Sequence, residues 1–254
     1  MKPILFSIGP FHVFSFGLFL AISFIISSFL IWKYGRENLI EEELMDTYVY
    51  TVFFSIIVSR FFYILLHPGE FGTKFLKYLV LREAPGLSLI GGLIGGAIFL
   101  FLYSRRRKLT FPKVADIFSL VLILGLSLAS LGEFFGGGSY GKETKLPWGV
   151  HVVGVSGARH PVELYGSLLF FFLFLFLSFV YQKLLRRREE GTLSLIFLFC
   201  FAVVILVLEF FKEASVYLYN NISLNQAVAG VVLIGVFVPL IKRLRAIYKN
   251  SKNK

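Results

Sequence analysis

Three charged residues lie inside apolar stretches of the sequence, where a charge is costly unless it serves a purpose. Arg60, Glu133 and Glu209 each lie within or at the end of a long apolar run. Ionisable side chains in such runs pair with one another or mark a site of binding or catalysis. A carboxylate can accept a proton, and an arginine can bind an anionic group. We therefore expect one polar cavity walled by these three residues. The alternative is that they form structural ion pairs between helices.

A second candidate site is the segment 159–165, which reads Arg-His-Pro-Val-Glu-Leu-Tyr. Pro161 suits the first turn of a helix. Arg159 and His160 then lie at the mouth of an apolar span, and Glu163 lies in its first turn, where the helix dipole favours a negative charge. A basic pair at a membrane surface is a plausible phosphate site. The alternative is a helix start with interfacial anchors.

Two clusters of glycine also call for an explanation. Gly91-Gly92 and Gly95-Gly96 lie inside one apolar run, and the segment 132–141 contains a second cluster. Small residues four apart let a neighbouring helix approach closely; the alternative is that bare backbone lines a lipid or substrate cleft. The second cluster is too rich in glycine for a helix interior. We expect it to leave the helix near the outer membrane surface and to offer backbone amides to an anionic headgroup.

The composition places these residues in an integral membrane protein. The chain has 254 residues, of which 57% are hydrophobic and only 16% charged, and its mean hydropathy is +0.78. A soluble domain has about 25% charged residues. Cys200 is the only cysteine, which excludes a disulfide scaffold. The net charge of +11 fits basic loops beside an anionic leaflet, so no nucleic-acid partner is expected.

The apolar runs predict an all-α, polytopic fold with seven transmembrane helices in a single domain covering residues 1–254. The predicted spans are 12–32, 47–66, 86–103, 115–135, 164–181, 192–211 and 226–241. Basic residues concentrate in alternate loops, so we expect the N-terminus outside and the C-terminus in the cytoplasm. The longest outer connection is the Gly-rich segment 136–162, and 75–81 is predicted as an interfacial helix. Asp116 is expected to cap or begin its own span. No cluster has metal-ligand spacing, so no metal and no cofactor is predicted.

In these motifs the chain resembles the bacterial prolipoprotein diacylglyceryl transferases, over nearly its whole length and in the same order. The motifs that carry the resemblance are 6–10 with 16–18, 59–63 around Arg60, 87–95 around Gly91 and Gly92, 131–141 around Glu133, 159–165, 209–213 beginning at Glu209, and 223–226. Matches to the family pattern include Arg60, Gly91, Gly92, Gly132, Gly141, Arg159, His160, Pro161, Glu163, Tyr165 and Glu209.

The chain also departs from the family pattern. Five positions that are polar in the family carry other residues here: Phe16 for Tyr, Ile90 for His, Ser130 and Ile205 each for Arg, and Gly138 for Glu. Glu133 stands where the family has Asn. These replacements remove two permanent positive charges that the family's site would use, so Arg60, Arg159 and Lys212 are the remaining cations for a phosphate.

The resemblance implies a transfer reaction at the bacterial cytoplasmic (inner) membrane. The family moves a diacylglyceryl group from phosphatidylglycerol to the lipobox cysteine thiol of a prolipoprotein, and glycerol phosphate leaves. The implied partners are phosphatidylglycerol, or another phospholipid, and the prolipoprotein signal peptide. The resemblance implies catalytic roles for His160 and Glu209, and we expect Glu133, which stands where the family has Asn, to be catalytic as a replacement base. The implied substrate-binding residues are Arg60, Gly91, Gly92, Arg159, Glu163 and Tyr165. The alternative is a degenerate relative that binds phospholipid or lipoprotein without transfer.

Overall fold

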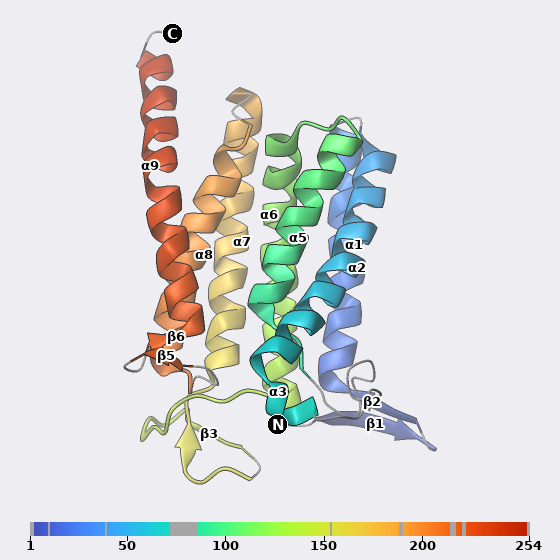
Figure 1. Ribbon diagram of the computed structural model, residues 1–254, viewed down its shortest axis with the longest axis vertical. Coiled ribbons are helices and arrows are strands. Elements are labelled where there is room, and N and C mark those ends of the chain that lie inside the picture. Colours follow the sequence, from blue (N-terminus) through green and yellow to red (C-terminus); the bar gives the residue numbers. More distant parts are fainter. Residues whose placement is uncertain are drawn as a thin grey trace. The chain divides into compact units, whose positions relative to one another are not determined.

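The computed structural model describes residues 3–9, 11–38, 40–71, 86–152, 154–187, 190–213, 217–219 and 222–252 (Figure 1). Its long helices are α1 (Ser15–Glu37), α2 (Glu41–Leu66), α5 (Leu89–Arg106), α6 (Phe111–Gly136), α7 (Val162–Arg187), α8 (Thr192–Phe211) and α9 (Leu224–Lys252). The short elements are α3 (Pro68–Phe71) and the strands β1 (Ile4–Ile8), β2 (Phe11–Phe14), β3 (Val150–His151), β4 (Ala158–Arg159), β5 (Tyr217–Tyr219) and β6 (Ile222–Ser223). The strands pair as three antiparallel hairpins.

The seven predicted spans are confirmed as helices. Within the described residues, seven helices are long and apolar enough to cross a membrane. Their outer faces carry large apolar side chains that water would not tolerate in such number; Phe53 is 66% exposed, Phe172 62% and Ile234 78%. The chain is therefore a multi-pass membrane protein. The interfacial helix predicted at 75–81 lies outside the described residues, and the orientation of the termini stays a prediction.

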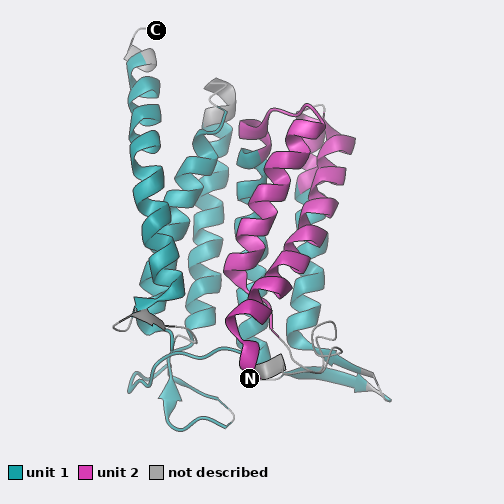
Figure 2. Cartoon of the chain, in the orientation of Figure 1, with its two compact units in different colours: residues 1–30, 115–254 teal, residues 31–114 magenta. Residues whose placement is uncertain are grey.

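The chain forms two compact units, shown in different colours in Figure 2. One unit contains residues 1–30 and 115–254, and the other contains residues 31–114. The first unit holds most of α1, nearly all of α6, and α7–α9. The second unit holds the end of α1, α2, α3, α5 and the first four residues of α6.

In the second unit, the glycine stripe of α5 packs directly on α2. A Cβ atom on Gly91 would lie 2.4 Å from Cβ of Phe62, and one on Gly95 would lie 2.5 Å from Cβ of Val58. Both distances are shorter than real Cβ atoms allow. The close-approach interpretation of this glycine motif is confirmed at Gly91 and Gly95, which let the two helices touch through backbone and Cβ atoms.

Two alanine substitutions in this stripe should have opposite effects on stability. Gly95→Ala forces Val58 and α2 outward, and such overpacking costs about 1–3 kcal/mol. Gly92→Ala meets Ser59 at an ordinary 3.5 Å, so the better helix propensity of alanine should leave stability unchanged or raise it by up to about 1 kcal/mol. Thermal unfolding in detergent measures both. Equal melting temperatures for the two variants would contradict the packing described here.

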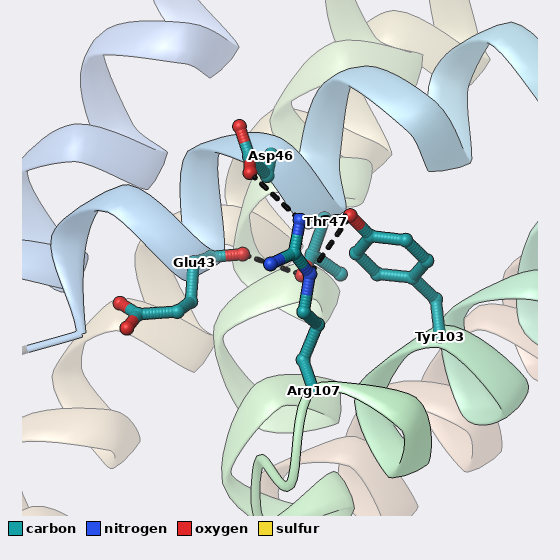
Figure 3. Close-up of polar contacts among 5 residues, drawn as sticks. All are labelled: Glu43, Asp46, Thr47, Tyr103 and Arg107. Carbon is teal, nitrogen blue, oxygen red and sulfur yellow. Dashed lines mark hydrogen bonds and ion pairs between the residues drawn. The ribbon is translucent and has the colours of Figure 1, made fainter.

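The basic end of α5 is tied to the start of α2 within the same unit (Figure 3). Arg107 donates from Nη2 to Asp46 Oδ2 at 3.2 Å, and from Nε and Nη2 to the Tyr103 hydroxyl at 3.1 and 2.9 Å. Hydrogen bonding to Tyr103 raises the pKa of Arg107, and the charge of Asp46 acts in the same direction. Both partners of the ion pair are about half exposed, so its contribution to stability is small.

In the first unit, Asp116 caps a helix other than its own. Its carboxylate accepts hydrogen bonds from the amides of Gly191 at 2.6 Å and Ser194 at 2.7 Å. Gly191 precedes α8 with φ of 81° and has no side chain with which to cap it. Asp116 supplies the missing acceptor from α6. The expectation that it caps or begins its own span is therefore wrong, because Asp116 lies beyond the first turn of α6.

Candidate functional site

The site is assembled at one end of the first unit, where the outer segment 137–161 joins the ends of α6, α7 and α8. Helix α6 ends at Gly136, and Gly137 follows in the left-handed region with φ of 70°. The predicted helix exit in the glycine cluster is thus confirmed. The expectation of free amides is wrong for two of its glycines, because Gly137 donates to Glu133 O and Gly141 donates to His160 O.

Backbone hydrogen bonds hold the outer segment against α7 and α8. The Lys142 amide donates to Phe211 O at 2.8 Å, and the His160 amide donates to Lys142 O at 3.0 Å. Gly141 fits this junction because a Cβ there would lie 2.7 Å from the His160 carbonyl oxygen and from its Cβ. The start of α7 and the end of α8 are therefore fixed side by side through Gly141 and Lys142.

One ammonium group at this junction pairs with one carboxylate and interacts electrostatically with two more, each from a different helix. Lys212 Nζ donates to Glu163 Oε1 at 2.7 Å, and the charges of Glu133 and Glu209 also act on Lys212. Burial lowers the pKa of Lys212, but the attraction of these carboxylates outweighs burial and leaves the pKa raised. Lys212 is therefore held as a cation among three potential negative charges.

Glu209 is anchored by the start of the last helix. It is 6% exposed; its Oε2 accepts from Ser223 Oγ at 2.7 Å and its Oε1 from Asn225 Nδ2 at 2.6 Å. Ser223 and Gln226 form a reciprocal capping box, in which each backbone amide donates to the other's side chain at 3.0–3.1 Å. Helix α9 thus begins at a fixed point, from which two donors hold Glu209 in place.

Glu133 differs from its two acidic neighbours. It is half-buried in the last turn of α6 and interacts electrostatically with Glu163 and Lys212. Among the described residues, no side chain or amide forms a hydrogen bond with its carboxylate. Glu163 and Glu209 are both occupied by donors, so Glu133 is the carboxylate of this cluster best able to take a proton from another molecule.

Arg159 ends β4 at the same junction. It donates from Nη1 to Glu213 Oε2 at 2.9 Å and from Nε to Ser156 O at 3.1 Å, and its guanidinium lies 5.9 Å from the centre of the Tyr140 ring. Only 14% of its side chain is exposed, against 52% for Glu213. An incoming anion can replace the exposed Glu213 carboxylate on this arginine.

A pocket of about 470 Å³ opens between α7 and α8 beside the junction. Leu168, Leu169 and Phe172 line it from α7, and Val207, Leu208 and Phe211 from α8. Trp148, His160 and Tyr165 also line it, and the surface it presents is apolar. Trp148 Nε1 donates to the Tyr165 hydroxyl at 2.7 Å, and that hydroxyl lies 3.5 Å from His160 Nδ1. The pocket is thus an apolar groove, which suits a lipid chain.

The structure brings together six of the nine residues that the sequence proposes for the site. These are Glu133, Arg159, His160, Glu163, Tyr165 and Glu209, all in the first unit. Arg60, Gly91 and Gly92 lie in the second unit, where Arg60 donates from Nη1 to Gly86 O at 3.0 Å and faces the Tyr63 ring at 6.0 Å. The substrate-binding role of these three residues stays a prediction.

Sequence reasoning left three residues of this region out of the predicted site, Trp148, Ser223 and Asn225, and it named Lys212 only as a remaining cation for the phosphate. For Lys212 the available signal was its place one turn after Glu209. For Ser223 and Asn225 the signal was the Ser-x-x-Gln capping box directly before the last span. Nothing in the sequence singles out Trp148, because an interfacial tryptophan is common in membrane proteins.

Comparisons with known proteins all point to one protein family. Residues 3–241 match the family model described as prolipoprotein diacylglyceryl transferase. A phosphatidylglycerol–prolipoprotein diacylglyceryl transferase of Finegoldia magna is 25% identical over 99% of this chain and 100% of its own. Similar enzymes of Legionella pneumophila and Pseudoalteromonas atlantica are 29% and 28% identical over 96% of this chain, and over 98% and 90% of their own.

Proposed function

The chain belongs to the prolipoprotein diacylglyceryl transferase family, and we propose that it is an active transferase of the bacterial cytoplasmic membrane. Its donor is phosphatidylglycerol and its acceptor is the lipobox cysteine of a prolipoprotein signal peptide. The observation that carries the proposal is the cluster of Glu133, Glu163 and Glu209 around Lys212, beside a lipid-sized pocket. Base, cation and apolar groove are the three parts that this reaction needs.

The reaction moves one proton and exchanges one bond for another. The thiol, with an ordinary pKa of about 8.5, first loses its proton to a base. The thiolate attacks the glyceryl carbon that carries the phosphate ester, a C–S bond forms and the C–O bond breaks. The electron pair of that bond leaves on glycerol phosphate, and the diacylglyceryl thioether remains. A cation at the phosphate stabilises the charge that develops there.

The residues of the junction fit these roles. Glu133 is the base, because its carboxylate has no hydrogen-bond donor among the described residues. Arg159 and Lys212 are the cations that meet the leaving phosphate. Glu209 holds the start of α9 and keeps Lys212 charged. His160 and Tyr165, which line the pocket, contact the donor lipid.

The same arrangement explains how activity can survive the departures from the family pattern. Ser130 and Ile205 replace two arginines of the family. The Ser130 side chain packs against α7, since a Cβ atom on Gly166 would lie 3.6 Å from Ser130 Oγ. A Cβ on Gly138 would meet nothing within 4 Å, so loss of the family's Glu there leaves open space. Glu133 in place of an Asn adds a carboxylate next to Lys212. We propose that this pair takes over proton and charge handling from the lost residues.

A reconstituted assay tests the function. The purified protein in vesicles of phosphatidylglycerol is mixed with a lipobox peptide, and the thioether product is sought by mass spectrometry. The expected product carries one diacylglyceryl group on sulfur, and a peptide with Ser in place of the lipobox Cys yields none. Lipid binding without thioether product would instead favour a degenerate relative, and would overturn the proposal of activity.

A further inference from the structure

Three residues that line the α7–α8 pocket form a chain of hydrogen bonds that starts at Trp148. The indole Nε1–H is a donor only, and it lies 2.7 Å from the Tyr165 hydroxyl oxygen. That oxygen must therefore accept the first bond. The hydroxyl keeps one proton of its own, and His160 Nδ1 lies 3.5 Å away. With the Tyr165 proton donated to Nδ1, the chain runs from Trp148 through Tyr165 to His160.

Trp148 is 56% exposed, but the residue is fixed through its backbone. It follows Pro147 in a tight turn that the Gly149 amide closes on Leu146 O at 2.9 Å, and proline at the second position presets such a turn. The turn is anchored to the strand before His160, because the Thr144 amide donates to Ala158 O at 2.8 Å. Trp148 and His160 are thus fixed on one locked piece of the outer segment.

The ring of His160 is also confined on its other side. Phe211 lies edge-on to it with centroids 5.2 Å apart, and the Tyr165 ring lies edge-on at 6.2 Å. Aromatic contacts of this kind orient a ring but do not choose which of its nitrogens carries the proton. Among the described residues, only the Tyr165 hydroxyl is recorded as a hydrogen-bond partner of that ring.

We propose that Trp148 is a positioning residue that sets the tautomer of His160. By occupying the Tyr165 oxygen as donor, it sends the Tyr165 proton to His160 Nδ1. The neutral imidazole then carries its proton on Nε2. His160 thereby carries an N–H donor on Nε2, suited to an ester or phosphate oxygen, rather than a base. This proposal rests on the proposed function for its consequence in catalysis and leaves Glu133 as the base.

The tautomer can be measured without any substrate. Spectra of the ¹⁵N-histidine-labelled protein in detergent, at roughly pH 8.5, report neutral histidines because the ordinary pKa of histidine is about 6.5. The chain has four histidines, and a His160→Gln sample identifies the signals of His160. The expected wild-type spectrum shows a protonated Nε2 and an unprotonated Nδ1. In Trp148→Phe, which keeps an aromatic ring but removes the donor, both signals should move toward the average of the two tautomers.

Trp32→Phe is the matched control, since Trp32 lies in α1 and belongs to the second unit, and its spectrum should equal that of the wild type. A protonated Nδ1 in the wild type would overturn the proposal. An unchanged His160 spectrum in Trp148→Phe would also overturn it.

Kinetics give a second readout through a double-variant cycle. Trp148→Phe should lower kcat/KM about fivefold, which corresponds to the loss of one neutral hydrogen bond. In a Tyr165→Phe background the same substitution should have no further effect, because the chain is already broken. If the two substitutions instead lowered kcat/KM independently, so that their fold-reductions multiplied in the double variant, the proposed hydrogen-bond chain would be contradicted. If the protein transfers no lipid, this cycle yields nothing, but the spectra still decide the tautomer, so failure of the two proposals can be told apart.

Discussion

Glu133→Gln is expected to lower the turnover of diacylglyceryl transfer by at least about 100-fold, since a positioned general base contributes roughly 10²–10⁴ in rate. Glutamine keeps the size and polarity of the side chain but cannot take the thiol proton. The Glu163–Lys212 ion pair remains in place, so the protein should fold normally. Initial rates with the lipobox peptide, measured under saturating phosphatidylglycerol, give kcat.

The effect of Glu133→Gln should also depend on pH. If the thiol must lose its proton without help, activity of the variant should recover as the pH approaches the ordinary thiol pKa of about 8.5. Glu42→Gln, the same substitution on the exposed first turn of α2, is the matched control and should keep the wild-type rate. A wild-type rate in Glu133→Gln across pH 6–9 would remove Glu133 from the mechanism.

Lys212→Met is expected to have the largest effect on stability. The substitution keeps a long apolar stem but leaves Glu163, Glu209 and Glu133 without their shared cation. Removing one partner of a buried ion pair costs about 3–5 kcal/mol. The Lys212 side chain is 30% exposed and that of Glu163 is 10% exposed, so we expect the lower end of this range. Thermal unfolding in detergent, followed by tryptophan fluorescence, measures the loss.

Charge compensation separates electrostatics from packing in this experiment. The double variant Lys212→Met with Glu163→Gln removes one negative charge together with the cation, and should regain a large part of the lost stability. Lys142→Met, which replaces an exposed lysine of the outer segment, should melt like the wild type. A double variant no more stable than Lys212→Met alone would show that the lysine contributes through its stem and not through its charge.

The membrane fold could be predicted from the sequence because it depends on local composition. Seven apolar runs long enough to cross a bilayer must become helices, since backbone groups in lipid have no other partners. All seven are helices here. The ends differ by a few residues; α9, for example, extends to Lys252, because polar residues continue a helix beyond the apolar core. The glycine spacing in α5 likewise predicted close packing, since the absence of a side chain is itself a local property.

The candidate site could be predicted only in its residue types. Charges inside apolar runs drew attention to Glu133 and Glu209, and the Arg-His-Pro segment drew attention to Arg159 and His160. The sequence could not predict which of these charged side chains contact one another, because such contacts depend on how helices far apart in the chain pack together. Asp116 shows the same limit: a carboxylate near a helix start looks like a cap for its own helix, yet it caps α8 from α6.

The sequence alone thus determined that the chain crosses the membrane seven times and which family it resembles. It also showed which ionisable residues fall inside apolar runs. Hydropathy and motif order are properties of the linear chain, so no tertiary structure was needed for these conclusions. Tertiary structure decided that Lys212 is the shared cation of three carboxylates and that Trp148 reaches Tyr165. Such contacts join α6, α7, α8 and the outer segment, and their energies depend on distances that no single segment contains.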